Sequence, residues 1–300
     1  MPTRPAPGPA PEPDPAPTPA PGPAAATAAA TDLDESIRSF VEAFSRLAAR
    51  FPGSRCEPYP GGTAAWSGTP LPFLNNCFVD APAAGSADRA AALATLRRHL
   101  DAARAYAADK GQPWFAALCT DRLPAGWQDV VAGDGLHVAM PITGMVAEAL
   151  LPPRRPPPGL SLRRVGDEAS RRAVAELHDR AYDLPAGMCD CLASEGLWPD
   201  DVFGVVGSVG GEDVSTATAW AQGEALYVAM VATRPGHGRR GYGERVMREA
   251  LRLAGAATGR DPAVRARTIL HATDAGRPVY AAMGYRDAAR FVLLSTEGHG

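Results

Sequence analysis

The residues best suited to chemistry lie in one segment, where an apolar run leads into a turn rich in glycine and arginine. Residues 226–233 read Leu-Tyr-Val-Ala-Met-Val-Ala-Thr, and residues 234–243 read Arg-Pro-Gly-His-Gly-Arg-Arg-Gly-Tyr-Gly. Apolar side chains then recur at helical spacing over 243–256. The first amides of a helix lack internal partners and lie at the positive end of its dipole, and glycine lets the backbone approach an anion closely. The segment therefore predicts a phosphate or pyrophosphate site.

A literal dinucleotide fingerprint, G-x-G-x-x-G, occurs in this turn as Gly-His-Gly-Arg-Arg-Gly at 236–241. Such a unit also needs an acidic residue at the end of the next strand, roughly 20 residues further on. Asp261 has that separation but precedes the next predicted strand, whereas Asp274 follows the strand and is too distant. Pro235 and the bulky arginine pair also suit the turn poorly, so the spacing disfavours a dinucleotide.

The same residues resemble motif A of the GNAT superfamily of N-acetyltransferases, V-x-x-x-P-x-x-[Q/R]-x-x-G-x-[G/A]. Its fixed positions hold Val231, Pro235, Gly241 and Gly243. Gly238 stands where the motif has Gln or Arg, and the neighbouring Arg239 can supply the missing charge. Residues 270–285, Leu-His-Ala-Thr-Asp-Ala-Gly-Arg-Pro-Val-Tyr-Ala-Ala-Met-Gly-Tyr, resemble motif B of the same family. The resemblance covers about 160–300.

This resemblance implies that an acceptor amine attacks the thioester of acetyl-CoA directly in a ternary complex. Val231 and Thr233 would offer backbone groups to the pantetheine arm, as an added strand would. Tyr280 occupies the position of the family's tyrosine, whose hydroxyl protonates the departing thiolate, although a packing role for this tyrosine stays open. The cofactor-binding residues would be Val231, Ala232, Thr233, Gly238, Arg239, Arg240, Gly241, Tyr242, Gly243, Glu244 and Thr273.

The sequence leaves the general base open. Glu224 starts the predicted strand that leads to the glycine turn, and a solvated strand-end role is its alternative. His271 and Asp274 follow the next predicted strand and are further candidates. A chain of water molecules could also carry the proton.

Alternating strands and helices position these residues and predict an α/β fold. In the second half, strands are expected at 160–165, 202–209, 215–221, 225–233, 268–272 and 289–295, with helices at 169–182, 243–256 and 276–283. In the first half, helices are expected at 33–51 and 87–110, an extended region at 64–79, and strands at 114–119 and 137–142. The family resemblance implies a mixed, largely antiparallel central sheet flanked by helices.

Composition divides the chain into two tandem α/β halves. Residues 1–31 are dominated by Pro, Ala and Thr and are expected to form an extended, disordered tail. The proline-rich stretch 151–159 predicts a linker between 32–150 and 160–300. The first half resembles the later part of a GNAT fold in its order of elements, which implies a degenerate GNAT-like half packed against the active one.

Two asparagines in the first half, Asn75 and Asn76, have two interpretations. They could face a cleft shared by the halves. Alternatively, they could cap a turn, which is the common role of asparagine.

Charge and cysteine content exclude several classes of function. The net charge of −3 and the alternation of arginines with acids disfavour nucleic-acid or membrane partners. The spacing of the five cysteines suits neither a disulfide framework nor a zinc site, so no metal is expected. Reduced thiols, with no predicted leader or membrane span, favour the cytoplasm. A homodimer remains compatible with the sequence.

The sequence thus favours an acetyl-CoA-dependent N-acyltransferase acting on a small-molecule amine. Two alternatives stay open: a non-catalytic acyl-CoA-binding regulator whose first half is the output module, and an acetyltransferase that modifies proteins.

Overall fold

The computed structural model describes residues 23–82, 88–153 and 157–296, which form a mixed α/β structure. The first half contains α1 (Pro23–Ala48), β1 (Arg55–Tyr59), β2 (Gly62–Trp66), the short 3-10 helix η1 (Pro72–Leu74), β3 (Asn75–Val79), α2 (Arg89–Ala108), β4 (Phe115–Cys119), η2 (Thr120–Arg122), α3 (Trp127–Gly133) and β5 (His137–Ala147). The second half contains β6 (Leu160–Arg164), α4 (Glu168–Ala181), η3 (Asp190–Ala193), η4 (Glu195–Leu197), β7 (Phe203–Val209), β8 (Glu212–Gln222), β9 (Ala225–Thr233), α5 (Tyr242–Thr258), β10 (Thr268–Ala272), α6 (Arg277–Ala282) and β11 (Arg286–Ser295).

Within the described residues, eleven strands form one sheet in the order β1-β2-β3-β4-β11-β5-β10-β9-β8-β7-β6. Two neighbouring pairs are parallel, β3 with β4 and β9 with β10, and the remaining pairs are antiparallel. Each parallel pair is connected by a long helix, α2 in the first half and α5 in the second, because parallel strands require a crossover. This confirms the mixed, largely antiparallel sheet that the sequence predicted.

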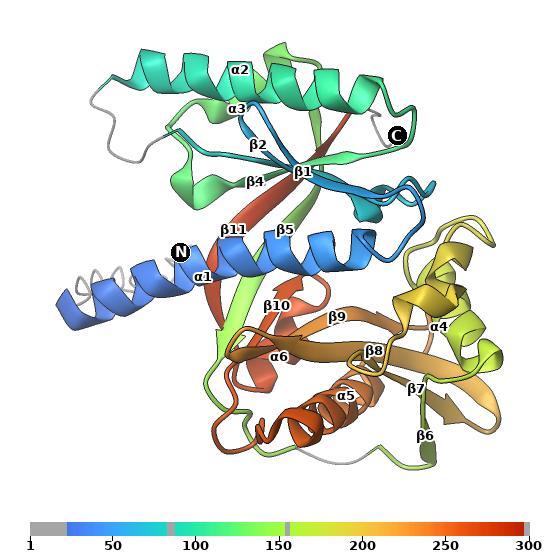
Figure 1. The fold of residues 1–300 in the computed structure, drawn as a ribbon. Coiled ribbons are helices and arrows are strands. Elements are labelled where there is room, and N and C mark those ends of the chain that lie inside the picture. The colour runs from blue at the N-terminus through green and yellow to red at the C-terminus, as the bar shows by residue number, and fades with distance from the viewer. Residues whose placement is uncertain (1–22, 83–87, 154–156, 297–300) are drawn as a thin grey trace, which may run out of the picture.

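The two halves exchange strands at the middle of the sheet. β11, from the end of the chain, lies between β4 and β5, and Phe291 pairs with both Cys119 and Ile142. β5, from the first half, lies between β11 and β10, and its Gly144 pairs with His271. Figure 1 shows these two long strands passing from one half into the other. The halves therefore complete each other's sheet, which differs from two sheets packed side by side.

Helices cover both faces of the second half's strands. On one face, α5 packs its apolar stripe on β7, β8 and β9, in a cluster that includes Leu226, Val228, Val246, Met247 and Leu270. On the other face, α4 packs over β8 and β9 and α1 packs over β10, in a cluster that includes Ala43, Leu47, Ala175, Tyr227 and Ile269. α1 thus belongs to the first half in sequence but lies across the junction of the two, where it contacts β2 and β5 of the first half and β10 and β11 of the second (Figure 1).

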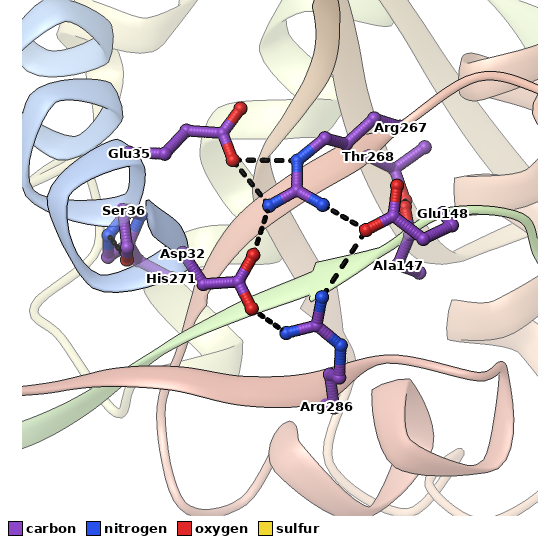
Figure 2. A network of polar contacts seen from close by, with 9 residues as sticks. All are labelled: Asp32, Glu35, Ser36, Ala147, Glu148, Arg267, Thr268, His271 and Arg286. Carbon is purple, nitrogen blue, oxygen red and sulfur yellow. Dashed lines mark hydrogen bonds and ion pairs between the residues drawn. The ribbon is translucent and has the colours of Figure 1, made fainter. Parts of the chain in front are cut away.

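The start of α1 corrects the expected tail. The helix begins at Pro23, so residues 23–31 are helical rather than extended, and the expected disorder of 1–22 lies outside the described residues. Ion pairs anchor this end of the helix: Arg267, which precedes β10, binds Asp32 at 2.6 Å and also Glu35 (Figure 2). Asp32 is 6% exposed, and it pairs with Arg286 as well. Residues 24–30 are alanines with one threonine, and alanine has the highest intrinsic helix propensity, so this run continues the helix that the ion pairs anchor.

Local signals fix the helix ends near the predicted boundaries. Asp167 caps α4 by accepting the Ser170 amide at 2.8 Å, and the Ser170 side chain returns a bond, which completes a capping box. α5 ends at Gly259, whose φ of +68° favours glycine. One strand is longer than expected: β5 was predicted to end at Ile142 but continues to Ala147, because β10 and β11 pair with its second part.

Candidate functional site

The parallel strands β9 and β10 separate in the middle of the sheet. Their pairing covers three residue pairs, from Leu226 with Thr268 to Val228 with Leu270. β9 then continues to Thr233, where it is paired only with β8. Backbone groups on the β10 side of residues 229–233 are therefore available to an extended ligand, which could bind as an added strand does.

A β-bulge lies in β9 directly beyond this separation. The register against β8 shifts between Thr216 and Thr218, opposite Met230. Met230 has a φ of +51°, which is uncommon for a residue with a side chain and costs about 1 kcal/mol. Such strain concentrates at functional sites, where a bulge redirects backbone groups. The apolar run 226–233 does not reveal this bulge, because no glycine or other turn residue marks it.

The glycine-rich turn joins the end of β9 to α5. Gly241 caps the helix with a φ of +81°, and no side chain accepts the amides of the first turn. Arg245 makes the first bond of this helix, to the Gly241 carbonyl, so the preceding amides have no carbonyl one turn before them. A Cβ built at Gly236, Gly238 or Gly241 would find no atom within 4 Å. The helix N-terminus is therefore open to a ligand.

Charge at this turn favours an anion. Arg239 and Arg240 are exposed, and neither forms an ion pair or hydrogen bond within the described residues. Glu244, the one acidic residue in the first turn, is neutralised by Arg248 at 2.8 Å. The structure therefore leaves two cations and a helix N-terminus at the same open turn, an arrangement that suits a pyrophosphate.

The remaining predicted binding residues lie on or next to the two strands that diverge here, β9 and β10. Val231, Ala232 and Thr233 form the end of β9, and Thr273 follows β10, where its carbonyl accepts the amides of Gly276 and Arg277 at 3.0 Å. The Tyr242 side chain is buried against His237, with ring centroids 6.2 Å apart, so only its backbone faces the open turn. These predicted binding residues therefore offer mainly backbone atoms, rather than side-chain atoms, to a ligand.

Tyr280 lies on α6, on the α5 side of the sheet. It is 8% exposed, with its ring against Gly276 and 6.1 Å from the Tyr285 ring. Burial raises the pKa of Tyr280, and the nearby phenols of Tyr182 and Tyr285 raise it further. Within the described residues its hydroxyl forms no hydrogen bond, and the buried hydroxyl of the neighbouring Tyr285 has no partner either. Tyr280 is therefore a protonated phenol with a free donor.

The structure removes two candidates for the general base. The Glu224 side chain is fully exposed beside Arg260, at the end of β9 opposite to the separation from β10. His271 has both ring nitrogens engaged, Nδ1 with Tyr227 and Nε2 with Ser36, and burial lowers its pKa to about 3. Asp274 is exposed in the turn after β10 and remains, with water, a candidate.

Asn75 and Asn76 cap a turn and do not face a cleft. Asn75 is fully buried, and its carbonyl oxygen accepts the Ser67 and Gly68 amides at 3.1 Å. The amide nitrogen of Asn76 donates to the Phe73 carbonyl at 2.7 Å. Of the two interpretations, the cleft role is therefore wrong and the turn-capping role is confirmed.

Metal and membrane sites are not evident in the described residues. No group of three or more His, Cys, Asp or Glu side chains there could hold a metal ion. The five cysteines are all unpaired. Within the same ranges, no helix combines the length and apolar character that spanning a bilayer requires.

Comparison with known proteins gives a clear result at the level of fold. No family model matches the chain, and no curated protein does. A GCN5-related N-acetyltransferase from Kribbella flavida is similar in structure, with a TM-score of 0.59 and 20% identity over 84% of this chain and 92% of its own. A functionally unknown conserved protein from Staphylococcus epidermidis ATCC 12228 has a TM-score of 0.56 and 10% identity, over 83% and 96% of the two chains. The chain has a GNAT fold along most of its length.

Proposed function

We propose that this protein is an acetyl-CoA-dependent N-acetyltransferase that acts on a small-molecule amine. One observation carries the proposal: the parallel strands β9 and β10 separate beside a bulge at Met230, and β9 leads directly into the open, arginine-flanked N-terminus of α5. A ligand with an extended arm and a pyrophosphate at one end would match both features, with the arm along β9 and the pyrophosphate at the N-terminus of α5. Coenzyme A has this shape, and the similarity to a GCN5-related N-acetyltransferase supports the choice.

The residues present fit the cofactor. The amides that follow Gly241 would bind the pyrophosphate, with Arg239 and Arg240 neutralising its charge. The end of β9, Val231 to Thr233, would hold the pantetheine arm through backbone hydrogen bonds. When bound, acetyl-CoA supplies an activated acyl group as a thioester.

Acyl transfer then requires two proton movements. The amine nitrogen attacks the thioester carbon, the C–S bond breaks, and the sulfur leaves as a thiolate. Tyr280 would donate its phenolic proton to that sulfur. The amine proton would leave to water or to Asp274, because Glu224 and His271 are unsuitable. The cytoplasm, where thiols stay reduced, is the compartment that we propose.

Thiol release tests this function. Purified protein, acetyl-CoA and a panel of small amines should yield free thiol and acetylated amine in equal amounts for at least one amine. Saturable acetyl-CoA binding without turnover on any amine would instead support a non-catalytic regulator. Turnover only with peptides that carry lysine or a free N-terminus would support a protein-modifying enzyme.

A further inference from the structure

A chain of three hydrogen-bonding side chains, of which Tyr227 and Ser36 are buried and His271 is partly exposed, crosses the point where β9 and β10 separate. The Tyr227 hydroxyl lies 2.8 Å from His271 Nδ1, and the Ser36 hydroxyl lies 3.2 Å from His271 Nε2. Tyr227 is 1% exposed and Ser36 is fully buried. The three residues come from β9, β10 and α1, so the chain joins both halves of the protein.

The position of the Tyr227–His271 bond relative to the strand pairing is specific. Val228 and Leu270 form the last parallel pair. Tyr227 precedes Val228, and His271 follows Leu270, so their side chains lie on one face and bridge that pair diagonally. The bond therefore ties the strands together at the vertex from which they diverge.

The packing of α1 holds the His271 ring in place. The Phe40 ring stacks on it with centroids 4.1 Å apart, and Phe291 meets it edge-on at 5.2 Å. A Cβ at Gly144 would lie 2.0 Å from the Ser36 hydroxyl oxygen, so only glycine lets the helix approach this closely. One turn earlier in the helix, Asp32 binds Arg267, close to the same strand (Figure 2).

This environment suits positioning and not proton transfer to a substrate. A neutral imidazole has one donor and one acceptor nitrogen, and Tyr227 and Ser36 occupy both positions. The two hydroxyls at its ends are buried, and the partly exposed imidazole between them has no unoccupied nitrogen that could take a proton from an amine. Its effect on chemistry must act through the geometry of the strands.

We propose that His271 is a positioning residue that fixes the vertex between β9 and β10, and hence the place of the thioester, with Ser36 as the first half's contribution. The inference rests on the proposed function. It gives the first half a role in the reaction itself: α1 holds the vertex through Ser36 and the ring of Phe40.

Two variants remove the hydrogen bond between Tyr227 and His271 with little change in side-chain size. His271→Phe keeps a stacking ring and loses both hydrogen bonds, and Tyr227→Phe loses only the hydroxyl. Ser39→Ala is the matched control, because Ser39 is 6% exposed on the same helix and its carbonyl, not its hydroxyl, binds Gln222. Circular dichroism would establish that each variant is folded.

The readout is affinity for two probes together with kcat. We expect both variants to lower kcat and acetyl-CoA affinity by roughly tenfold, while affinity for 3′-phospho-ADP, which carries only the pyrophosphate end, stays within about twofold. Ser39→Ala should match the wild type.

Unchanged kcat and acetyl-CoA affinity in both variants would overturn the inference. An equal loss for both probes would also overturn it, because a general loss of structure does not distinguish the two ends of the ligand. If the wild type binds neither probe, the proposed function itself fails and the inference fails with it.

Discussion

Gly243 and Thr233 lie so close that a Cβ on Gly243 would be 3.2 Å from the Thr233 hydroxyl oxygen. Thr233 ends β9, and Gly243 lies in the first turn of α5, so this contact sets the distance between the strand arm and the helix N-terminus. Ser215 holds the same hydroxyl at 2.9 Å. The two ends of the proposed acetyl-CoA site are therefore fixed relative to each other by packing.

Gly241→Val should abolish stabilisation by acetyl-CoA. Valine at a φ of +81° costs about 1–2 kcal/mol and displaces the amides that bind the pyrophosphate. At a ligand concentration 100 times the Kd, the wild type should gain about 2.7 kcal/mol, a clear rise in Tm. Thermal melts with and without acetyl-CoA measure the difference.

Gly259→Val is the control for this experiment. Gly259 lies at the other end of the same helix, has a φ of +68° and has open space around it, so valine there introduces comparable backbone strain away from the proposed site. Its variant should keep the ligand-induced rise in Tm. An equal rise in the Gly241→Val protein would place the pyrophosphate elsewhere.

Tyr280→Phe should lower kcat by roughly 100-fold or more, because the thiolate loses its proton donor. Acetyl-CoA affinity should stay close to that of the wild type, since the hydroxyl forms no hydrogen bond within the described residues that its removal would disturb. Steady-state kinetics and calorimetry separate the two quantities. Tyr285→Phe, on the neighbouring ring, is the matched control, and equal kcat in both variants would remove Tyr280 from the mechanism.

The alkaline side of the pH profile tests the same residue. Burial, and then the phenols of Tyr182 and Tyr285, raise the pKa of Tyr280 above its usual value of about 10. The active form is the protonated phenol, so this group should cause no loss of kcat up to about pH 10. A fall in kcat at pH 8–9 that is absent from Tyr280→Phe would contradict the raised pKa.

Arg267→Gln should destabilise the protein by about 2 kcal/mol, because it leaves Asp32 with one partner in place of two. Burial alone would raise the pKa of Asp32, but its bonds to Arg286 and Arg267 lower it overall. In the unfolded chain the pKa of this carboxyl is near 4. Because the pKa is lower in the folded protein, the ionised carboxylate stabilises the fold above about pH 4, and this stabilisation is lost as the pH falls through the folded-state pKa. Urea unfolding should therefore show the two proteins converging in stability below about pH 4.

The exposed pair of Arg252 and Glu249 provides the comparison for this prediction. The Arg252 side chain is 60% exposed, and Arg252→Gln should cost at most about 0.5 kcal/mol. Equal losses of stability in Arg267→Gln and Arg252→Gln would show that the ion pairs of Arg267 contribute no more than an exposed surface pair.

The chain should bind one acetyl-CoA, although its first half repeats the pattern of a parallel strand pair joined by a long helix. Asp88 caps α2, and its carboxylate accepts the Ala91 amide at 3.0 Å. That bond takes up an amide and places negative charge where a phosphate would bind. Calorimetry should give a stoichiometry close to one, and two equivalent sites would refute this interpretation.

The sequence predicted the second half well because its signals are local. Apolar periodicity located β9 and α5, and the glycines marked the turn between them within a residue or two. The exchange of β5 and β11 could not be predicted, because Phe291 and Cys119 pair across about half the chain and no local pattern specifies such a partner. The helix α1 also begins earlier than predicted, at Pro23, because the proline-rich composition of the preceding residues concealed the helix propensity of the alanine run that follows.

Within the site, sequence located backbone binding and missed the side-chain arrangement. Gly241 and Gly243 were identifiable from spacing. The left-handed backbone conformation of Met230 was not, because this residue lies in an ordinary apolar run. His271 was a candidate base because its residue type permits it, and only packing shows that Tyr227 and Ser36 occupy both nitrogens. Burial and partners, which decide a histidine's role, are properties of the fold.

A crystal structure with acetyl-CoA would show whether the open turn and the separated strands form the cofactor site. We expect the pyrophosphate oxygens within hydrogen-bond distance of the amides that follow Gly241, the pantetheine arm along Val231–Thr233, and the sulfur within reach of the Tyr280 hydroxyl. Acetyl-CoA bound elsewhere, or no acetyl-CoA bound at saturating concentration, would contradict this expectation.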